Sequence, residues 1–213
     1  MITLASLYDY TLPELPGITT ALLDIHLREV ARDFCRVSKF WRTPLDTENS
    51  VAGQATYDLY PDESYADLVK VTKLTVNGVL LYEDRYTAVS NTQNQPKYER
   101  GSPPFTVSAD MLELTLIPDE VPVSSQSAGV VMEGAIQPSP TATTLPDFFG
   151  GEFRNAICFG AMARCMAMGA KPWTDRAMAS EYARLYMSQV HLAAMRGSNG
   201  NTLAALRTRQ AGL

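Results

Sequence analysis

Apolar residues near the start of the chain recur with the period of an amphipathic helix. Between Thr19 and Pro44 their spacings are four, three, four, three and four, with charged residues on the opposite side. Lys39 and Arg42 would suit the negative end of the helix dipole. We predict a long helix that starts at Thr19 or Thr20 and ends at residues 42 to 44. The residues expected to face its core are Leu27, Val30, Phe34, Val37 and Trp41.

The last third of the chain predicts two more helices. After a proline-rich linker at residues 138–146, apolar positions alternate with small residues that would let another helix approach closely. Lys171 to Asp175 interrupts this pattern, and Thr174 or Asp175 is expected to cap a final helix that runs to about Arg196. The core residues expected from this region are Phe153, Ile157, Trp173 and Tyr182.

The middle of the chain has the alternation and composition of β-strands. Strands are expected at residues 56–60, 69–76, 79–82, 105–107, 111–117 and 129–136. Asn77-Gly78 stands between two of them, and both residues accept a positive φ, so the pair predicts a tight hairpin. Adjacent hairpins favour an antiparallel arrangement.

Together these elements predict an α+β fold. The first long helix and the two C-terminal helices would form a helical bundle from residues 1–44 and 145–196. An antiparallel, sandwich-like β domain at residues 45–144 would be inserted between them. Gly197, Asn199 and Gly200 are expected to end the last helix, which would leave residues 197–213 as an extended, flexible C-terminal arm.

Charge is sorted along the chain in the same way as structure. Residues 43 to 153 carry sixteen acidic and five basic side chains, whereas the rest carries seven acidic and thirteen basic ones. A fold does not need this sorting, which suggests a partner. The alternative explanation is that the acidic residues only keep a β-rich domain in solution.

Candidate chemistry is sparse in the sequence. His26 and His191 belong to no metal or catalytic motif, and Cys158 and Cys165 are too far apart for a C-x-x-C pair. We expect no catalytic residues, metal or cofactor, and we expect the three cysteines to be buried, reduced thiols. No apolar stretch is long enough for a membrane span.

Three segments together resemble the head-to-tail adaptor, or connector, proteins of tailed bacteriophages, including the tubular adaptors of short-tailed phages. They are Ala31-x-x-Phe34-Cys35-x-x-Ser38-x-x-Trp41-Arg42, Leu145-Pro146-Asp147-Phe148 and Lys171-Pro172-Trp173-Thr174-Asp175. The similarity follows nearly the whole chain in order and spacing. It implies a virion structural protein at the head–tail junction, made in the host cytoplasm, and not an enzyme.

The resemblance also implies partners. These are eleven further copies in a ring of twelve, the portal protein above it, and a tail or nozzle protein below it. Genomic DNA would pass through the ring without specific binding, and an acidic lining would repel its phosphates. The candidate lining residues are Asp110, Glu113, Asp119, Glu120 and Glu133.

The C-terminal arm is the part expected to reach the portal. Its candidate portal-binding residues are Arg196, Asn199, Leu203, Leu206, Arg207, Arg209 and Leu213. Two other classes of function stay open on sequence alone: a monomeric ligand-binding α+β domain and a small hydrolase. A mass measurement separates them from the adaptor, because only the adaptor is expected to enter a large ring.

Overall fold

The computed structural model describes residues 1–61, 65–81, 86–89, 97–100, 104–117 and 120–198. Helices and antiparallel sheets coexist, so the predicted α+β class is confirmed. The chain divides into two compact units. The helical unit comprises Met1–Trp41, Tyr65–Asp67 and Ile136–Leu213, and the β unit comprises Arg42–Ser64 and Leu68–Ala135.

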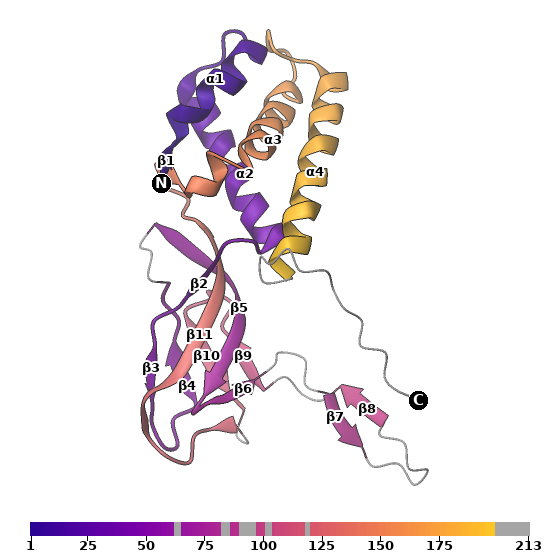
Figure 1. Cartoon of the computed structure of the whole chain (residues 1–213). Helices are drawn as coiled ribbons and strands as arrows, with labels where there is room; N and C mark the ends of the chain where they lie inside the picture. Colours follow the sequence, from indigo (N-terminus) through magenta and orange to yellow (C-terminus); the bar gives the residue numbers. More distant parts are fainter. Residues whose placement is uncertain (62–64, 82–85, 90–96, 101–103, 118–119, 199–213) are drawn as a thin grey trace. The chain divides into compact units, whose positions relative to one another are not determined.

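In the helical unit the three long helices α2, α3 and α4 lie side by side (Figure 1). They span Thr20–Ser38, Arg154–Met166 and Arg176–Ser198. Before α2 the chain forms the short helices η1 (Leu4–Leu7), α1 (Tyr8–Thr11) and η2 (Leu12–Glu14). A two-stranded pair, β1 (Ile2–Thr3) with β12 (Thr144–Leu145), and the 3-10 helix η4 (Asp147–Phe149) complete the unit.

The core of the helical unit is built on aromatic rings. Phe34 of α2 is fully buried and packs edge-on to Phe149 and tilted against Phe153, at centroid distances of 5.3 and 4.9 Å. Leu27, Val30, Phe153 and Ile157 are at most 1% exposed. Trp41, Trp173 and Tyr182 are half-buried against the same core.

Helix α2 begins as predicted and ends earlier than predicted. The Thr19 hydroxyl accepts a hydrogen bond from the Leu22 amide, which caps the first turn. Lys39 has a φ of 51°, in the left-handed region, and this stops the helix at Ser38. Trp41 therefore lies beyond the helix.

The prediction that Val37 faces the core is wrong, because its side chain is 51% exposed. The buried stripe of α2 leans toward Ala31, Cys35 and Ser38, and Val37 falls at its border. Ser38 takes the inward position of the last turn. Its hydroxyl accepts a hydrogen bond from the Phe40 amide at 3.2 Å, which satisfies the buried polar group.

Helix α4 buries small residues most deeply, packs Tyr182 and Tyr186 partly buried against the core, and leaves other large apolar residues exposed. Ala179, Val190 and Ala193 face the core, while Met178 and Leu192 are 39% and 43% exposed. The helix continues through Gly197 to Ser198, two residues beyond the predicted end at about Arg196. At Gly197 a Cβ atom would lie 3.3 Å from the carbonyl oxygens of both Ser38 and Lys39, which explains a glycine at this close approach.

The return to the helical unit comes at Ile136, earlier than the expected residue 145. Two arginines one turn apart on α2 hold this returning segment. Arg28 donates to the carbonyl oxygens of Ala142 at 2.7 Å and Pro140 at 3.2 Å. Arg32 donates to the Pro138 carbonyl at 2.7 Å and pairs with Asp67 at 3.1 Å. These bonds fix residues 136–144 to α2.

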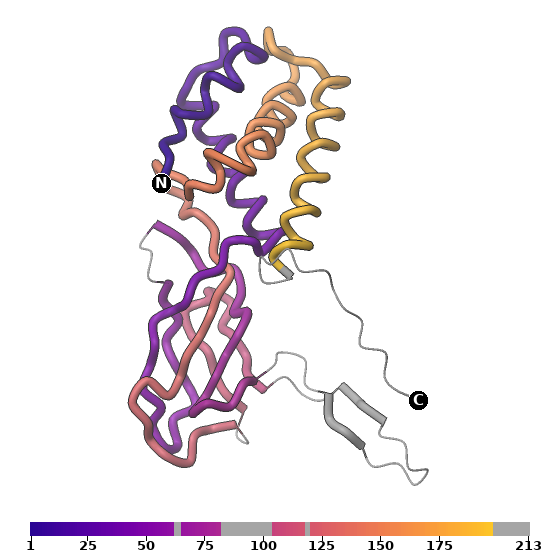
Figure 2. The backbone as a smooth tube through the Cα atoms, in the orientation of Figure 1, coloured from indigo at the N-terminus to yellow at the C-terminus, as the bar shows by residue number. Residues whose placement is uncertain are grey.

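The β unit contains two main sheets, and Figure 2 traces the path of its backbone. The larger has the order β2-β11-β5-β6, with β3 also paired to β11. Its strands are β2 (Arg42–Pro44), β3 (Glu48–Ser50), β5 (Ala66–Val76), β6 (Val79–Leu81) and β11 (Gln126–Pro138). The first two residues of β5 and the last three of β11 belong to the helical unit. The predicted hairpin at Asn77-Gly78 is confirmed, with φ values of 47° and 82°.

The smaller sheet has the order β4-β10-β9. These strands span Thr56–Asp58, Glu113–Leu116 and Phe105–Val107. A separate pair, β7 (Tyr86–Val89) with β8 (Lys97–Arg100), lies outside the strands expected from the sequence.

Candidate functional site

The three-stranded sheet has one buried and one exposed face. Tyr57, Leu114, Leu116 and Phe105 point inward and are at most 7% exposed. The register pairs Thr56 with Thr115 and Thr115 with Thr106, so three threonines form a row across the outer face. The next position along this face pairs Asp58 with Glu113. We call the residues Thr56, Asp58, Thr106, Glu113 and Thr115 the outer β face.

The Asp58–Glu113 pair places two carboxylates directly opposite each other. Both residues are exposed. Like charges opposed across an antiparallel ladder are destabilising, so this pair does not help the sheet to fold. The three strands contain no Lys or Arg that could offset it. Within these three strands, nothing offsets the negative charge of the outer β face.

A turn held by several hydrogen bonds closes the hairpin between β9 and β10. The Ser108 hydroxyl donates to the Asp110 carboxylate at 2.5 Å and accepts from the Glu113 amide at 3.0 Å. Asp110 accepts from the Leu112 amide at 3.2 Å. These hydrogen bonds hold the pKa of the Asp110 carboxyl below its usual value, so the group is ionised at neutral pH.

The same turn carries an exposed apolar side chain. Leu112 is 48% exposed beside Asp110, and Ala109 is exposed at the turn as well. Met111 holds a φ of 60°, which shapes the turn. We call residues 109–112 the hairpin tip. It combines one fixed carboxylate with one exposed leucine.

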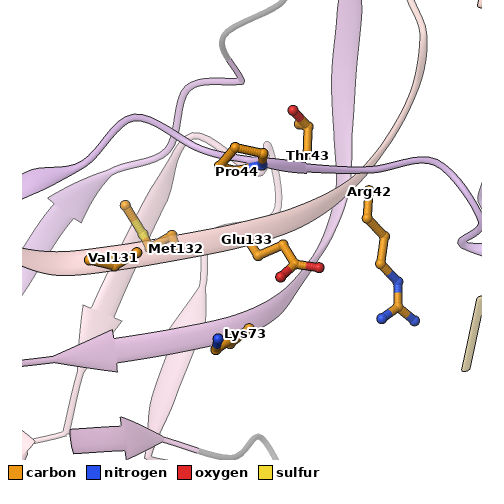
Figure 3. Close-up of a pocket in the computed structure, with 7 residues that line it drawn as sticks. All are labelled: Arg42, Thr43, Pro44, Lys73, Val131, Met132 and Glu133. Atoms are coloured by element: carbon orange, nitrogen blue, oxygen red, sulfur yellow. The ribbon is translucent and has the colours of Figure 1, made fainter. Parts of the chain in front are cut away.

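Glu133 lies in a different setting, on β11 of the larger sheet. It lines a cavity of about 160 Å³ together with Arg42, Lys73, Pro44, Val131 and Met132. In Figure 3 its carboxylate extends from β11 toward the side on which Arg42 and Lys73 lie. Glu133 therefore belongs to a surface of mixed charge, unlike Asp58 and Glu113.

The remaining predicted channel and portal residues divide between described and undescribed parts of the chain. Glu120 is half-buried, and Asp119 lies outside the described residues. Arg196 forms an ion pair with Glu152 and its guanidinium lies 5.8 Å from the centre of the Phe40 ring. The structure thus places Arg196 in contacts within its own unit. Six portal candidates lie outside the described residues: Asn199, Leu203, Leu206, Arg207, Arg209 and Leu213.

A groove runs between α3 and α4 on the helical unit. It encloses about 580 Å³, and its apolar lining consists of Ala163, Ala167, Ala179 and Ala183. Two arginines contribute the charge. Arg164 forms an ion pair with Asp33. Arg176 has no ion-pair partner among the residues that the structure describes. We call this the α3–α4 groove.

Groups capable of acid–base or metal chemistry are few. Across the described ranges, no three His, Cys, Asp or Glu residues come close enough to hold a metal ion. The three cysteines are buried and unpaired, and burial raises the pKa of the Cys158 and Cys165 thiols to about 11. In the same ranges, no helix combines the length and apolar character of a membrane span.

His26 is the one histidine with an unusual environment among the described residues. Its Nε2 atom is buried without a hydrogen-bond partner. Burial lowers the pKa of the imidazole, and the positive charge of Arg164 lowers it further. The neutral form is therefore favoured, which fits a packed side chain at the edge of the helical core.

Sequence reasoning missed the residues that the fold adds to these surfaces. Asp58 belongs to the outer β face only because the strand register sets it opposite Glu113. Arg176 lines the α3–α4 groove only because α3 packs on α4. The small residues of α3 were the one signal in the sequence for a close helix pair.

Neither protein-family models nor curated proteins provide a match to this chain.

Proposed function

We propose that this protein is a structural adaptor that forms a ring through which double-stranded DNA passes. The resemblance to head-to-tail adaptors implies a ring of twelve copies. The observation that carries the proposal is the outer β face, where Asp58 and Glu113 oppose each other on strands without a basic residue. The resemblance of three sequence segments to head-to-tail adaptors supports the same function.

The β unit is more acidic than the helical unit, as expected if the β unit lines a DNA channel. By sequence, the β unit carries thirteen acidic and six basic side chains, and the helical unit carries ten acidic and twelve basic ones. DNA binds where Lys and Arg neutralise its phosphates, and release of counterions makes that binding depend on salt. An acidic surface repels the duplex and lets it slide. The β unit is the better candidate for the channel.

The threonine row is consistent with this role. Thr56, Thr106 and Thr115 are short, uncharged side chains that can bind water without holding a phosphate ionically. The portal and a tail protein remain the proposed partners above and below the ring. The undescribed residues after Ser198 remain the proposed portal-binding arm, now without Arg196.

Charge reversal on the outer β face tests the channel. In assembled rings, Asp58→Lys combined with Glu113→Lys is expected to make short duplex DNA bind at low salt, with affinity that falls steeply as salt rises. A phage that carries the double variant is expected to eject its genome more slowly. The matched control is Asp9→Lys with Glu14→Lys, which reverses two exposed acids of the helical unit.

The measurement is fluorescence anisotropy of a labelled duplex across a salt series. The unmodified ring and the control are expected to leave the duplex free at physiological salt. Tight binding of DNA by the unmodified ring would contradict the proposal, and so would identical behaviour of the channel variant and the control.

A further inference from the structure

The α3–α4 groove and the hairpin tip match each other in charge and in chemistry. The groove has a floor of alanine side chains and a rim that includes Arg164 and Arg176. The tip offers one leucine, 48% exposed, next to the ionised carboxylate of Asp110. The two surfaces are complementary, because the groove carries bases and the tip carries an acid.

We propose that the hairpin tip of one copy docks in the α3–α4 groove of the next copy and so forms the contact between subunits. Leu112 lies on the alanine floor, and Asp110 pairs with Arg176. This contact deepens the proposed function and rests on it. It gives Asp110 a role between subunits in place of the channel-lining role predicted from sequence.

The groove suits an inserted side chain. Ala163 and Ala179 are buried at 8% and 7% exposure, and the groove that they line holds about 580 Å³ of space. A leucine on an alanine floor buries apolar surface on both copies. Arg164 is already paired with Asp33, which leaves Arg176 as the cation available to an incoming carboxylate.

The tip is prepared for docking before contact. Ser108 fixes the Asp110 carboxylate at 2.5 Å, and the amides of Leu112 and Glu113 complete the turn. A surface that is already ordered loses little conformational entropy on binding. Because tip and groove are different surfaces, the contact is heterologous, and repeated copies of such a contact close into a ring when the rotation between copies permits.

A charge exchange between two variants tests this contact. Arg176→Glu places an acid in the groove beside the acidic tip of the next copy, and Asp110→Lys places a base on the tip beside the basic groove. Each variant alone is expected to need at least about tenfold higher concentration to assemble. An equimolar mixture is expected to recover assembly, because every tip in an alternating ring then meets a groove of opposite charge.

Controls separate the contact from folding and from overall charge. Lys171→Glu and Asp9→Lys change exposed charges outside the two surfaces and are expected to assemble normally. Asp110→Lys removes hydrogen bonds of the turn, so Ala109→Lys, at an exposed position of the tip, provides a second basic variant. Circular dichroism confirms that each variant is folded.

The readout is mass by light scattering across a concentration series. Recovery of assembly only in the mixture supports the contact, whereas unaffected assembly of Arg176→Glu and Ala109→Lys alone overturns it and leaves the ring proposal standing. Variants that fail alone and also fail when mixed overturn the contact too. An unmodified chain that never assembles, even with a portal, overturns both proposals.

Discussion

Replacement of Gly160 by alanine is expected to destabilise the helical unit, although alanine is the better helix former. Gly160 lies on α3 where α2 and α4 both approach. A Cβ atom there would come closer to Val30 Cγ1 than two carbon atoms can approach, and would lie 3.0 Å from Tyr186 Cδ2. The new methyl group therefore meets two helices at once.

The magnitude follows from two opposing effects. Alanine in a helix interior gains about 1 kcal/mol over glycine, whereas a methyl group forced into a packed core costs about 1–3 kcal/mol. Val30 is fully buried and β-branched, and the Tyr186 hydroxyl donates to the Val30 carbonyl at 3.3 Å, so neither neighbour can move easily. The cost of the added methyl group is therefore expected in the upper part of its range, about 2–3 kcal/mol, which leaves a net loss of about 1–2 kcal/mol in the free energy of unfolding.

Urea unfolding followed by circular dichroism measures the loss. Gly169→Ala is the matched control, because nothing lies within 4 Å of a Cβ atom there, and it is expected to be neutral. The double variant Gly160→Ala with Val30→Ala is expected to be more stable than the two single changes predict by addition. A Gly160→Ala chain as stable as the unmodified one would refute the close approach of the three helices.

Three further predictions concern the helical unit. Phe34→Ala should lower the free energy of unfolding by about 3–5 kcal/mol, because it empties a fully buried site. Val37→Ala should change it by less than about 0.5 kcal/mol, because Val37 is exposed. Equal urea midpoints for the two variants would contradict the packing. Burial lowers the pKa of His26, so the unfolded state binds a proton before the folded state does as the pH falls. The free energy of unfolding should therefore drop below about pH 6.5. In urea melts at about pH 7.5 and 5.5, His26→Gln should reduce that drop. The three buried thiols should react with a colorimetric thiol reagent only on unfolding, and fast reaction of the native chain would contradict their burial.

The large apolar residues of α2 could be predicted from sequence because their spacing is helical and their burial leaves a strong signal. Phe34 and Val30 are examples. The end of α2 could not be predicted, because it depends on a left-handed conformation at Lys39, and lysine rarely adopts that conformation. For Val37, the competing inward residue was a serine, and sequence patterns assign serine to the surface.

The buried face of α4 could not be predicted from the sequence for a different reason. Close packing against α3 selects Ala179 and Ala193, whose small side chains add little to a hydrophobic pattern, while Met178 and Leu192 remain outside. In the β unit the positions of β4, β5, β6, β9, β10 and β11 were predictable from composition and from the Asn77-Gly78 turn, whereas β2, β3, β7 and β8 were not expected. Register was not, and the outer β face exists only because register sets Asp58 against Glu113.

The mass of the protein in solution tests the central proposal most directly. Size-exclusion chromatography with light scattering would be run on the chain alone and with a candidate portal. A ring of twelve 23.4-kDa chains has a mass of about 280 kDa, and we expect a species of that size, alone or bound to the portal. A chain that remains at 23.4 kDa at every concentration, with and without the portal, would contradict the adaptor function.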